Sequence, residues 1–413
     1  MSEAYIIDAC RTPRGIGKMG KGALSHLHPQ QLAAVVLEAL RDRNALHTDD
    51  VDDIIWSTST QVGKQGRDIG RMAALDAGYS TKASGMTLDR FCGGGITAVN
   101  LAAAQLMSGM EDLVIAGGGE MMSYTSSIAS TTEPPMLDAG NLRLRARHPQ
   151  SQQGVCADAI ATIENIDRDA VDRLAAESQR RAGQAIAEQR FDRSIVAVHN
   201  IDGTLALDRE EFPRPATSLE SLSELKPAFE RWATVAIDEA GTTYGDLLRQ
   251  KYPELTQFSH VHHAGNSSGV VDGAAAILLA SKQYAETHGL TPRARVVATA
   301  NVGDCPTLML NAPVAAARKV LAKAGLAIGD IDVFEINEAF AVVAEKFIRD
   351  LDLDRDKVNI NGGAIALGHP IGATGAILVG TALDELERSG GRYGLITMCA
   401  AGGMAPAIII ERL

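Results

Sequence analysis

The sequence predicts an α/β protein made of two similar halves with a further region inserted between them. Two observations support this prediction: strand-like and helix-like segments alternate along the chain, and the element order of 31–62 and 92–120 recurs at 313–343 and 372–403. Alternating strands and helices are typical of a mainly parallel sheet covered by helices. The region at 123–260 differs, because it carries Ser/Thr/Pro runs and polar helical segments, and we interpret it as an insertion at the rim.

The first repeated unit is a helical pattern, an acidic turn and an apolar strand. It reads QLAAVVLEALRDRNALHTDDVDDIIWSTSTQV at 31–62, and PVAAARKVLAKAGLAIGDIDVFEINEAFAVV at 313–343 keeps the order with a shorter helix. The second unit is a Gly-rich turn, a helix and a strand, as in CGGGITAVNLAAAQLMSGMEDLVIAGGGE and GATGAILVGTALDELERSGGRYGLITMCAAGG. Because ligands of doubly wound folds bind where loops follow strands, both Gly-rich turns are candidate site segments.

Composition excludes several classes of function. The 413 residues include 51 acidic and 39 basic ones, and this balance argues against a nucleic-acid partner but allows a local basic patch for a small phosphorylated ligand. No apolar run reaches the roughly 18 residues of a membrane span, and the N-terminal residues show no secretory signal. Five scattered cysteines match no zinc motif and indicate reduced thiols. We therefore expect a cytoplasmic protein without a metal.

Cys92 and His369 are the candidate nucleophile and base. Cys92 stands directly before a helical segment, where backbone N–H groups favour a thiolate and could hold an oxyanion. His369 precedes a proline within NGGAIALGHPIGATGA, at 361–376, and the proline biases it away from helical geometry. If equivalent turns of the two halves face one cleft, the two side chains meet there. The alternatives are a buried structural cysteine and a structural loop histidine.

Two more polar side chains fall at the ends of repeated strands. Cys399 ends the strand in LITMCAAGGMAPA and could exchange a proton with the transferred group, or it could be a small buried hydrophobe. Asn337 in FEINEAFA could orient a water or an acyl oxygen, and helix capping is the alternative. His262 and His263 lack the spacing of metal ligands, so we interpret them as loop residues.

The other cysteines and glycine runs carry no motif that we recognise as functional. We expect Cys10, Cys156 and Cys305 to pack in the interior. The GGG at 117–119 does not form the GxGxxG fingerprint of dinucleotide binding.

Taken together, DRFCGGGITAVNLAA, NEAFA, NGGAIALGHPIGATGA and a terminal C-x-x-G-G-M resemble the thiolase family, and the resemblance spans essentially the whole chain. It implies the thiolase fold, with two similar βαβαβαββ halves stacked in five layers and an inserted loop domain. The N-terminal core half would comprise residues 1–122 plus 261–272, and the C-terminal core half residues 273–413. Residues 123–260 would form the loop domain, which binds CoA and substrate.

The resemblance implies thiolysis of a 3-ketoacyl-CoA by CoA, or the reverse Claisen condensation, with CoA as a substrate and no permanently bound cofactor. Cys92 would accept the acyl group, His369 would activate it, and Cys399 would protonate the leaving acetyl-CoA carbanion. Asn337 would hold a water that forms one oxyanion hole together with His369. The backbone N–H groups of Cys92 and Ala401 would form the second oxyanion hole.

The resemblance also indicates which residues contact the substrate. Ser268 in HAGNSSG would lie near the pantetheine, and Phe340 and Gly402 would line the substrate site. Lys226 in LKPAF would lie near the nucleotide end of CoA, although a solvated lysine explains it equally well.

Some positions depart from the family pattern. Glycine is usual where this chain has Ala401 and Ala405, and alanine would be penalised wherever a positive φ is needed, while Pro406 removes a local N–H. Gln152 and Gln153 stand where short-chain biosynthetic thiolases carry a His-Met pair, which disfavours an acetoacetyl preference.

An insertion suggests a degradative role. Residues 230–262 separate LKPAF from HAGNSSG, where many thiolases have only a few residues, and this resembles the thiolase subunits of fatty-acid β-oxidation complexes. We therefore expect degradative thiolysis of medium or long acyl chains by a homodimer or homotetramer, which a hydratase/dehydrogenase subunit could join. The alternatives are a biosynthetic acetoacetyl-CoA thiolase and a non-catalytic CoA-binding or assembly protein. A ketoacyl synthase would have a histidine in place of Cys399.

Overall fold

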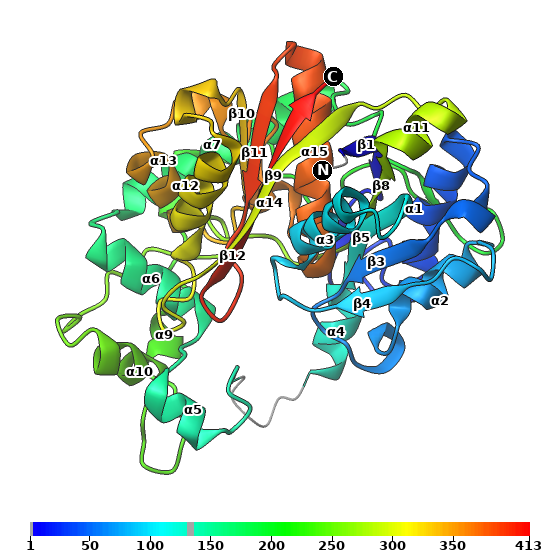
Figure 1. The fold of residues 1–413 in the computed structure, drawn as a ribbon. Coiled ribbons are helices and arrows are strands. Elements are labelled where there is room, and N and C mark those ends of the chain that lie inside the picture. Colours follow the sequence, from blue (N-terminus) through cyan, green and yellow to red (C-terminus); the bar gives the residue numbers. More distant parts are fainter. Residues whose placement is uncertain (1–2, 130–135) are drawn as a thin grey trace.

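A single large sheet runs through the molecule, for which the computed structural model describes residues 3–129 and 136–413 (Figure 1). Residues 130–135 of the expected loop domain lie outside this description. The strand order is β10-β11-β12-β9-β1-β8-β5-β3-β4, with the short β2 (Gly15–Ile16) beside β8. The strands of the N-terminal half are β1 (Ala4–Arg11), β3 (Asp53–Ser57), β4 (Met86–Leu88), β5 (Leu113–Met121) and β8 (Val271–Ser281). Those of the C-terminal half are β9 (Ala294–Gly303), β10 (Val333–Ile336), β11 (Tyr393–Thr397) and β12 (Met404–Arg412).

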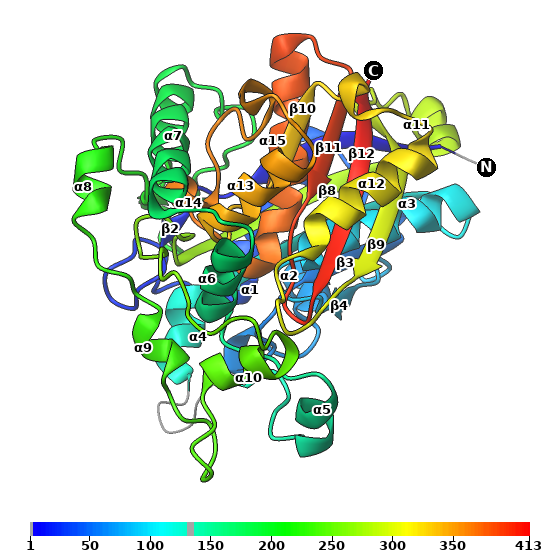
Figure 2. The same ribbon diagram turned by 90° about the vertical axis from the view of Figure 1, so that its left-hand side faces the viewer.

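Helices cover both faces of each half of the sheet and produce five layers. The outer N-terminal layer is α1 (Pro29–Arg43) and α2 (Ile69–Asp76), and the central layer is α3 (Gly94–Ser108) and α15 (Ile371–Ser389). The outer C-terminal layer is α12 (Ala312–Ala324) and α13 (Ala341–Asp350), and α12 crosses β12 and β9 in Figure 2. The shorter elements beside them are α11 (Lys282–His288), α14 (Ala364–Leu367) and the 3₁₀ turns η1 (Thr48–Asp50), η2 (Gly63–Gln65), η3 (Ile328–Asp330) and η4 (Arg355–Lys357).

Alternating apolar residues in the strands explain this layering. Successive strand residues point to opposite faces, so Ile54 packs with α1 and α2 while Ile55 packs with α3 and α15. In the C-terminal half, Ile408 packs with the central helices and Ile409 with α12 and α13. Both faces of the strands are therefore buried, and the expected five-layer α/β fold of two similar halves is confirmed.

The expectation of a mainly parallel sheet is wrong, because the sheet is mixed. Within the described residues, parallel pairing between strands is confined to β3 with β4, β3 with β5, and β10 with β11, and the other parallel contacts are isolated bridges. The strands β1, β8, β9 and β12 pair antiparallel with their neighbours. Parallel neighbours need a crossover connection, whereas antiparallel neighbours can be joined by a short turn, as β11 and β12 are.

The halves differ in one strand and share a seam. In the N-terminal half, β4 is a strand at the edge of the sheet. At the equivalent place in the C-terminal half there is only one parallel bridge, between Phe334 and Val358. The two halves of the sheet join where Tyr5 and Ile6 of β1 pair with β9. The predicted domain boundary at 272/273 falls inside β8, whose pairing with β1 and β5 continues to Ser281 on the N-terminal side. The division into domains otherwise stays a prediction.

The regular elements of the inserted region are mainly helices, and the region packs below and beside the C-terminal half (Figure 1). α7 packs against α13 and α14, and α6 packs against α9, α10 and α13, so the residues at 230–262 that include α9 and α10 cover α6. The elements of this region are α4 (Met122–Ile128), α5 (Leu142–Arg147), α6 (Gln153–Ile163), α7 (Arg168–Ala187), β6 (Val198–His199), β7 (Leu205–Leu207), α8 (Leu219–Ser223), α9 (Glu230–Ala233) and α10 (Tyr244–Lys251).

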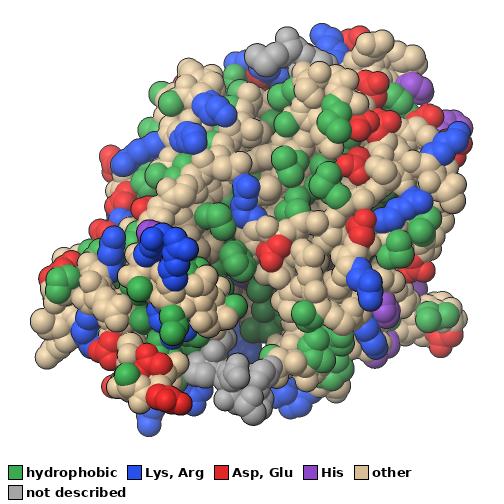
Figure 3. All heavy atoms as spheres, turned by 60° about the horizontal axis from the view of Figure 1, so that its bottom comes forward, with side chains coloured by type: hydrophobic (Ala, Val, Ile, Leu, Met, Phe, Trp, Pro, Cys, Tyr) green, Lys and Arg blue, Asp and Glu red, His purple; other side chains and the backbone are tan. Residues whose placement is uncertain are grey.

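The surface and the cysteines agree with the composition. None of the helices in the described part of the chain is both long and apolar enough to span a membrane. On the face shown in Figure 3, Lys and Arg side chains are interspersed with Asp and Glu. All five cysteines are free thiols. Cys10 and Cys156 are buried as expected, whereas Cys305 is half-exposed and its sulfur accepts a hydrogen bond from Tyr252.

Candidate active site

The first turns of α3 and α15, one from each half, are in direct contact. A Cβ atom on Gly375 would lie 2.1 Å from the backbone nitrogen of Ile96, and a Cβ atom on Gly95 would lie 2.8 Å from the backbone nitrogen of Ala376. Neither glycine has room for a side chain, and the two backbones can touch because glycine has none. Cys92 stands just before α3 and His369 just before α15, so the two Gly-rich turns lie together as the sequence predicts.

Cys92 is held in a neutral environment, which corrects one expectation. Its side chain is 7% exposed, and Phe91 before it adopts a positive φ of 48° that turns the chain into α3. Burial raises the pKa of the Cys92 thiol to about 12, and the nearby Glu120 adds to this, although the backbone N–H of Cys92 acts in the opposite direction. Desolvation of the thiolate therefore outweighs the effect of the helix start, and the expectation that the helix start makes this thiol easier to deprotonate than a free cysteine is not met.

His369 is oriented by hydrogen bonds at both ring nitrogens. Thr374 donates its hydroxyl hydrogen to the carbonyl of Pro370 at 2.9 Å, so its oxygen accepts from Nδ1–H of His369 at 2.6 Å. Nε2 then carries no hydrogen, and it accepts from the side-chain amide of Asn337 at 3.4 Å. Before the histidine, Gly368 adopts a φ of 94°, and a Cβ there would lie 2.4 Å from the side chain of Val271.

The electrostatic surroundings keep the imidazole neutral. Burial lowers the pKa of His369 to about 4, and the positive charge of Arg14 adds to this. Arg14 donates a hydrogen bond to the carbonyl of Gly368 at 3.4 Å and forms an ion pair with Glu210 at 2.7 Å. A neutral ring with an unprotonated Nε2 is the form that a general base requires.

Asn337 does not cap a helix. The following helix, α13, has Phe340 at its N-cap position with no side-chain hydrogen bond, so the capping alternative for Asn337 fails. Its side chain is fully buried, and Oδ1 has no hydrogen-bond partner among the described residues. A buried acceptor without a partner fits a bound water or a ligand group.

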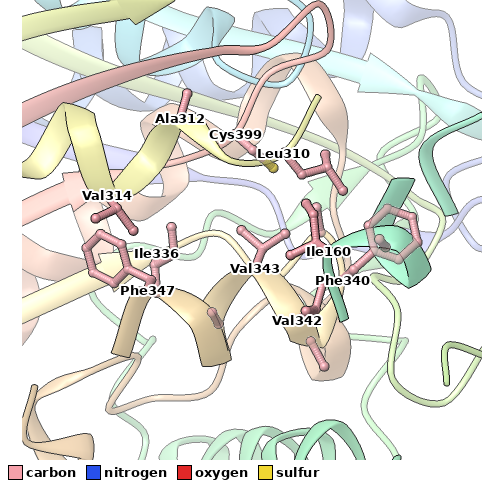
Figure 4. Packing of buried hydrophobic residues seen from close by; sticks show 14 of the residues in the cluster. Ile160, Leu310, Ala312, Val314, Ile336, Phe340, Val342, Val343, Phe347 and Cys399 are labelled. Carbon is pink, nitrogen blue, oxygen red and sulfur yellow. The ribbon is translucent and has the colours of Figure 1, made fainter. Parts of the chain in front are cut away.

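Cys399 lies next to Cys92 at the end of β11. A Cβ atom on Gly93 would lie 3.3 Å from the Cβ of Ala400, so the two cysteine turns are adjacent. Burial raises the pKa of Cys399, and proximity to Cys92 raises it further. Cys399 also belongs to the apolar cluster with Leu310 and Phe340 (Figure 4).

The turn after Cys399 resolves the question about its alanines. The positive φ values fall on Gly402 (77°) and Gly403 (76°), and Ala401 keeps a negative φ, so alanine is not strained at this position. The hydrogen bonds that close the turn join Ala400 to Met404 and do not use the N–H of Ala401. The strain that φ > 0 would place on Ala401 is therefore not present.

The segment 263–269 lies against the histidine, and Phe340 lies beside it. Ser268 donates its backbone N–H to Ala339 at 3.0 Å, and the carbonyl of Gly269 accepts from the N–H of His369 at 2.9 Å. Phe340 contacts Phe229 and His262 edge-on, at 5.6 and 5.7 Å between ring centroids.

The remaining predicted residues lie in the inserted region. Lys226 is exposed, in the connection between α8 and α9, and so does not belong to the buried group around Cys92. Gln152 caps α6, where its side chain accepts from the N–H groups of Gly154 and Val155. A Cβ atom on Gly154 would lie 2.0 Å from the ring of Phe229, so this glycine makes room for the aromatic residue.

The interpretation of His262 and His263 as loop residues missed their partners. Each ring is buried and bonded to a carboxylate of the inserted region: Nδ1 of His262 to Asp158 at 2.8 Å, and Nε2 of His263 to Asp172 at 2.9 Å. The role of Glu120 was also missed: its carboxylate accepts the N–H of Gly372 at 3.0 Å and so fixes the start of α15 on the N-terminal half. No local pattern marks these residues, because their partners are far apart in the sequence.

The molecule is thus an α/β protein of two stacked, similar halves, with Cys92 and His369 just before two helix starts that touch. Comparison with known proteins is specific: the thiolase N-terminal domain matches residues 4–244, and the thiolase C-terminal domain matches residues 290–412. The chain belongs to the thiolase family.

Similar proteins span the full length. The chain is 40% identical over 430 residues to a β-ketoadipyl-CoA thiolase of Pseudomonas putida, with 100% of both covered. It is 39% identical over 420 residues to a steroid 3-ketoacyl-CoA thiolase of Mycobacterium tuberculosis, covering 100% of this chain and 95% of the relative. Among solved structures, the acetyl-CoA acetyltransferase of Bacillus anthracis matches with a TM-score of 0.82 and 32% identity, over 100% of this chain and 99% of that one.

Proposed function

We propose that this thiolase cleaves 3-ketoacyl-CoA with CoA, in the degradative direction, through an acyl group on Cys92. The observation that carries the proposal is the hydrogen-bonded series Thr374–His369–Asn337, which leaves Nε2 of His369 unprotonated where the starts of α3 and α15 touch. A nucleophile with a pKa of about 12 needs such a base, because almost none of it is ionised at neutral pH.

In the first step, Nε2 of His369 takes the proton of Cys92, and the sulfur attacks the C3 carbonyl of the substrate. The oxyanion formed at C3 would accept hydrogen bonds from Nε2–H of His369 and from a water held by Oδ1 of Asn337. The C2–C3 bond then breaks, its electron pair passes to C2 as the enolate of acetyl-CoA, and Cys399 protonates that carbon. Neutral thiols supply this proton, and burial keeps Cys399 neutral.

In the second step, the thiol of CoA gives its proton to the thiolate of Cys399 and attacks the acyl group on Cys92. The tetrahedral oxyanion would accept from the N–H groups of Cys92 and Ala401. Collapse of this intermediate releases a shortened acyl-CoA, and His369 returns the proton to the sulfur of Cys92. Losing one such donor typically costs on the order of 10²–10³ in rate.

Cys92→Ala and Cys399→Ala separate the two thiol roles. Cys92→Ala should lose thiolysis and all covalent acyl labelling. Cys399→Ala should still transfer the acyl group of a saturated acyl-CoA to Cys92 with release of CoA, because this step breaks no C–C bond. The same variant should lose cleavage of 3-ketoacyl-CoA. Wild-type activity in Cys92→Ala, or an unlabelled Cys399→Ala, would contradict this assignment.

The proposal has two candidates for the acyl group of the substrate. The insertion at 230–262 favours medium or long chains from fatty-acid β-oxidation, with Phe340, Ser268 and Gly402 along the substrate and Lys226 near the nucleotide. The names of the relatives favour a second candidate, degradation of aromatic compounds or steroids, with a 3-ketoacyl-CoA that bears a carboxylate or a ring. Turnover of 3-oxoadipyl-CoA beside unbranched 3-ketoacyl-CoAs of increasing length decides between them, since the preferred substrate has the higher kcat/KM.

The proposal includes a cytoplasmic homodimer or homotetramer. β4 forms one edge of the large sheet, and an open edge can pair with a second copy. A hydratase/dehydrogenase subunit could join such an assembly. Light scattering of the purified chain, alone and with a candidate hydratase/dehydrogenase, measures both.

A further inference from the structure

Asp172 is a buried carboxylate on α7 at which two distant segments of the chain meet. Its side chain is 4% exposed. Oδ2 accepts from Nε of Arg168 at 2.6 Å, and Oδ1 accepts from Nε2 of His263 at 2.9 Å and from the amide of Asn266 at 2.8 Å. Burial alone would raise the pKa of Asp172, but these three donors lower it, so the group is an anion that organises its neighbours.

The first connection runs through Arg168 to the segment before Lys226. Nη2 of Arg168 donates to the carbonyl of Leu222 at 2.6 Å and to that of Leu225 at 2.9 Å. These carbonyls lie at and just beyond the end of α8, and Lys226 follows directly. Asp172 holds the guanidinium that fixes this segment.

The second connection runs through His263 and Asn266. Gly265 donates its N–H to Nδ1 of His263 at 3.0 Å, so Nε2 carries the hydrogen and donates it to Asp172. Asn266 accepts the N–H of His263 on its side chain at 2.8 Å, and its carbonyl accepts the N–H of Ala341, the first residue of α13, at 3.0 Å.

The second connection continues to the proposed base. Ser268 donates its N–H to Ala339, Gly269 donates its N–H to Ala364 at 3.1 Å, and the carbonyl of Gly269 accepts the N–H of His369. Hydrogen bonds and a few peptide units therefore link the carboxylate of Asp172 to the backbone of His369.

We propose that Asp172 is a positioning residue for the reaction, which sets the segment before Lys226 and the segment 263–269 relative to each other and to His369. The proposal rests on the proposed function, in which Lys226 lies near the nucleotide of CoA and Ser268 lies along the substrate, in the segment bonded to His369. It differs from a merely structural ion pair because it predicts that the two connections affect different constants.

Asp172→Asn is the first test, with Asp138→Asn as the matched control. Asp138 is equally buried at 4% exposed and also pairs with an arginine of the inserted region, Arg145, but it makes none of the bonds above. We expect Asp172→Asn to weaken CoA binding by calorimetry about fivefold or more and to lower kcat about tenfold, since bonds to a buried charge are lost. Asp138→Asn should change both constants less than about twofold. Equal kinetic effects of the two variants at equal losses in Tm would overturn the proposal.

Single replacements on the two connections separate their effects. Arg168→Met should weaken CoA binding with kcat nearly unchanged, whereas His263→Ala should lower kcat and the rate of Cys92 acylation more than CoA affinity. If both variants change both constants in the same proportion, Asp172 only stabilises the fold. Arg168 is partly exposed, so its variant keeps the test decisive even if Asp172→Asn does not fold. If the wild-type protein shows no thiolysis, the proposed function is wrong. If wild type and Asp172→Asn both show normal thiolysis, only the positioning role of Asp172 is wrong.

Discussion

Gly375→Ala should separate the first turns of α3 and α15 and remove most of the activity. The new Cβ would lie 2.1 Å from the backbone nitrogen of Ile96, whereas ordinary contact begins at 3.4 Å, so the two helix starts must move apart by about 1.3 Å. Overpacking of this kind costs about 1–3 kcal/mol of stability. Misplacement of reacting groups by about 1 Å costs on the order of 10²-fold in rate, so we expect kcat to fall by about that factor.

Gly380→Ala on the same helix is the control. Its Cβ would lie 3.3 Å from the Cβ of Ala9, which a small shift accommodates, and alanine favours the helix by up to about 1 kcal/mol. Thiolysis rates and thermal unfolding of both variants are compared with wild type. A Gly375→Ala protein that keeps kcat within about threefold of Gly380→Ala would refute the argument that this contact sets the distance between nucleophile and base.

Three further changes test the site and its support. Thr374→Val keeps the shape but removes the acceptor of Nδ1–H of His369, so kcat should fall about tenfold and stability by about 1–3 kcal/mol, measured by steady-state kinetics and urea unfolding. Burial holds the pKa of His369 near 4, below its ordinary 6.5, so the unfolded chain binds the proton first as the pH falls. The free energy of unfolding should therefore decrease by about 3 kcal/mol between pH 6.5 and pH 4. His369→Gln should lack this decrease. Gln152→Ala should cost about 1 kcal/mol through loss of the α6 cap, with kcat unchanged, and an unchanged Tm would contradict the capping role.

The order of elements could be read from the sequence, but strand direction could not. The helix and strand periods of the repeated units are local, and both units fold as their patterns predict. Whether β1, β8 or β12 runs parallel to its neighbour depends on pairing between distant segments, for example Ala4 with Ser281. No period within a strand encodes that choice.

In the candidate site too, features with a local sequence pattern could be predicted, and features that depend on distant residues could not. The Gly-rich turns were recognisable because close backbone contact leaves a local mark, as at Gly375. The neutral state of Cys92 was not, because burial is produced by residues from the whole fold and here outweighs the helix start. The partners of His262 and His263 lie 104 and 91 positions away, so only the folded chain reveals them.

Keeping Cys92 and His369 uncharged at rest has a consequence for when the enzyme can react. In the proposed mechanism, proton transfer from Cys92 to His369 creates two opposite charges in a buried site, and burial disfavours both of them, so the sulfur would stay protonated in the empty protein. A bound 3-ketoacyl-CoA would supply the C3 carbonyl that the sulfur attacks as it loses its proton. Reactivity of Cys92 would thereby depend on occupancy of the site by a substrate.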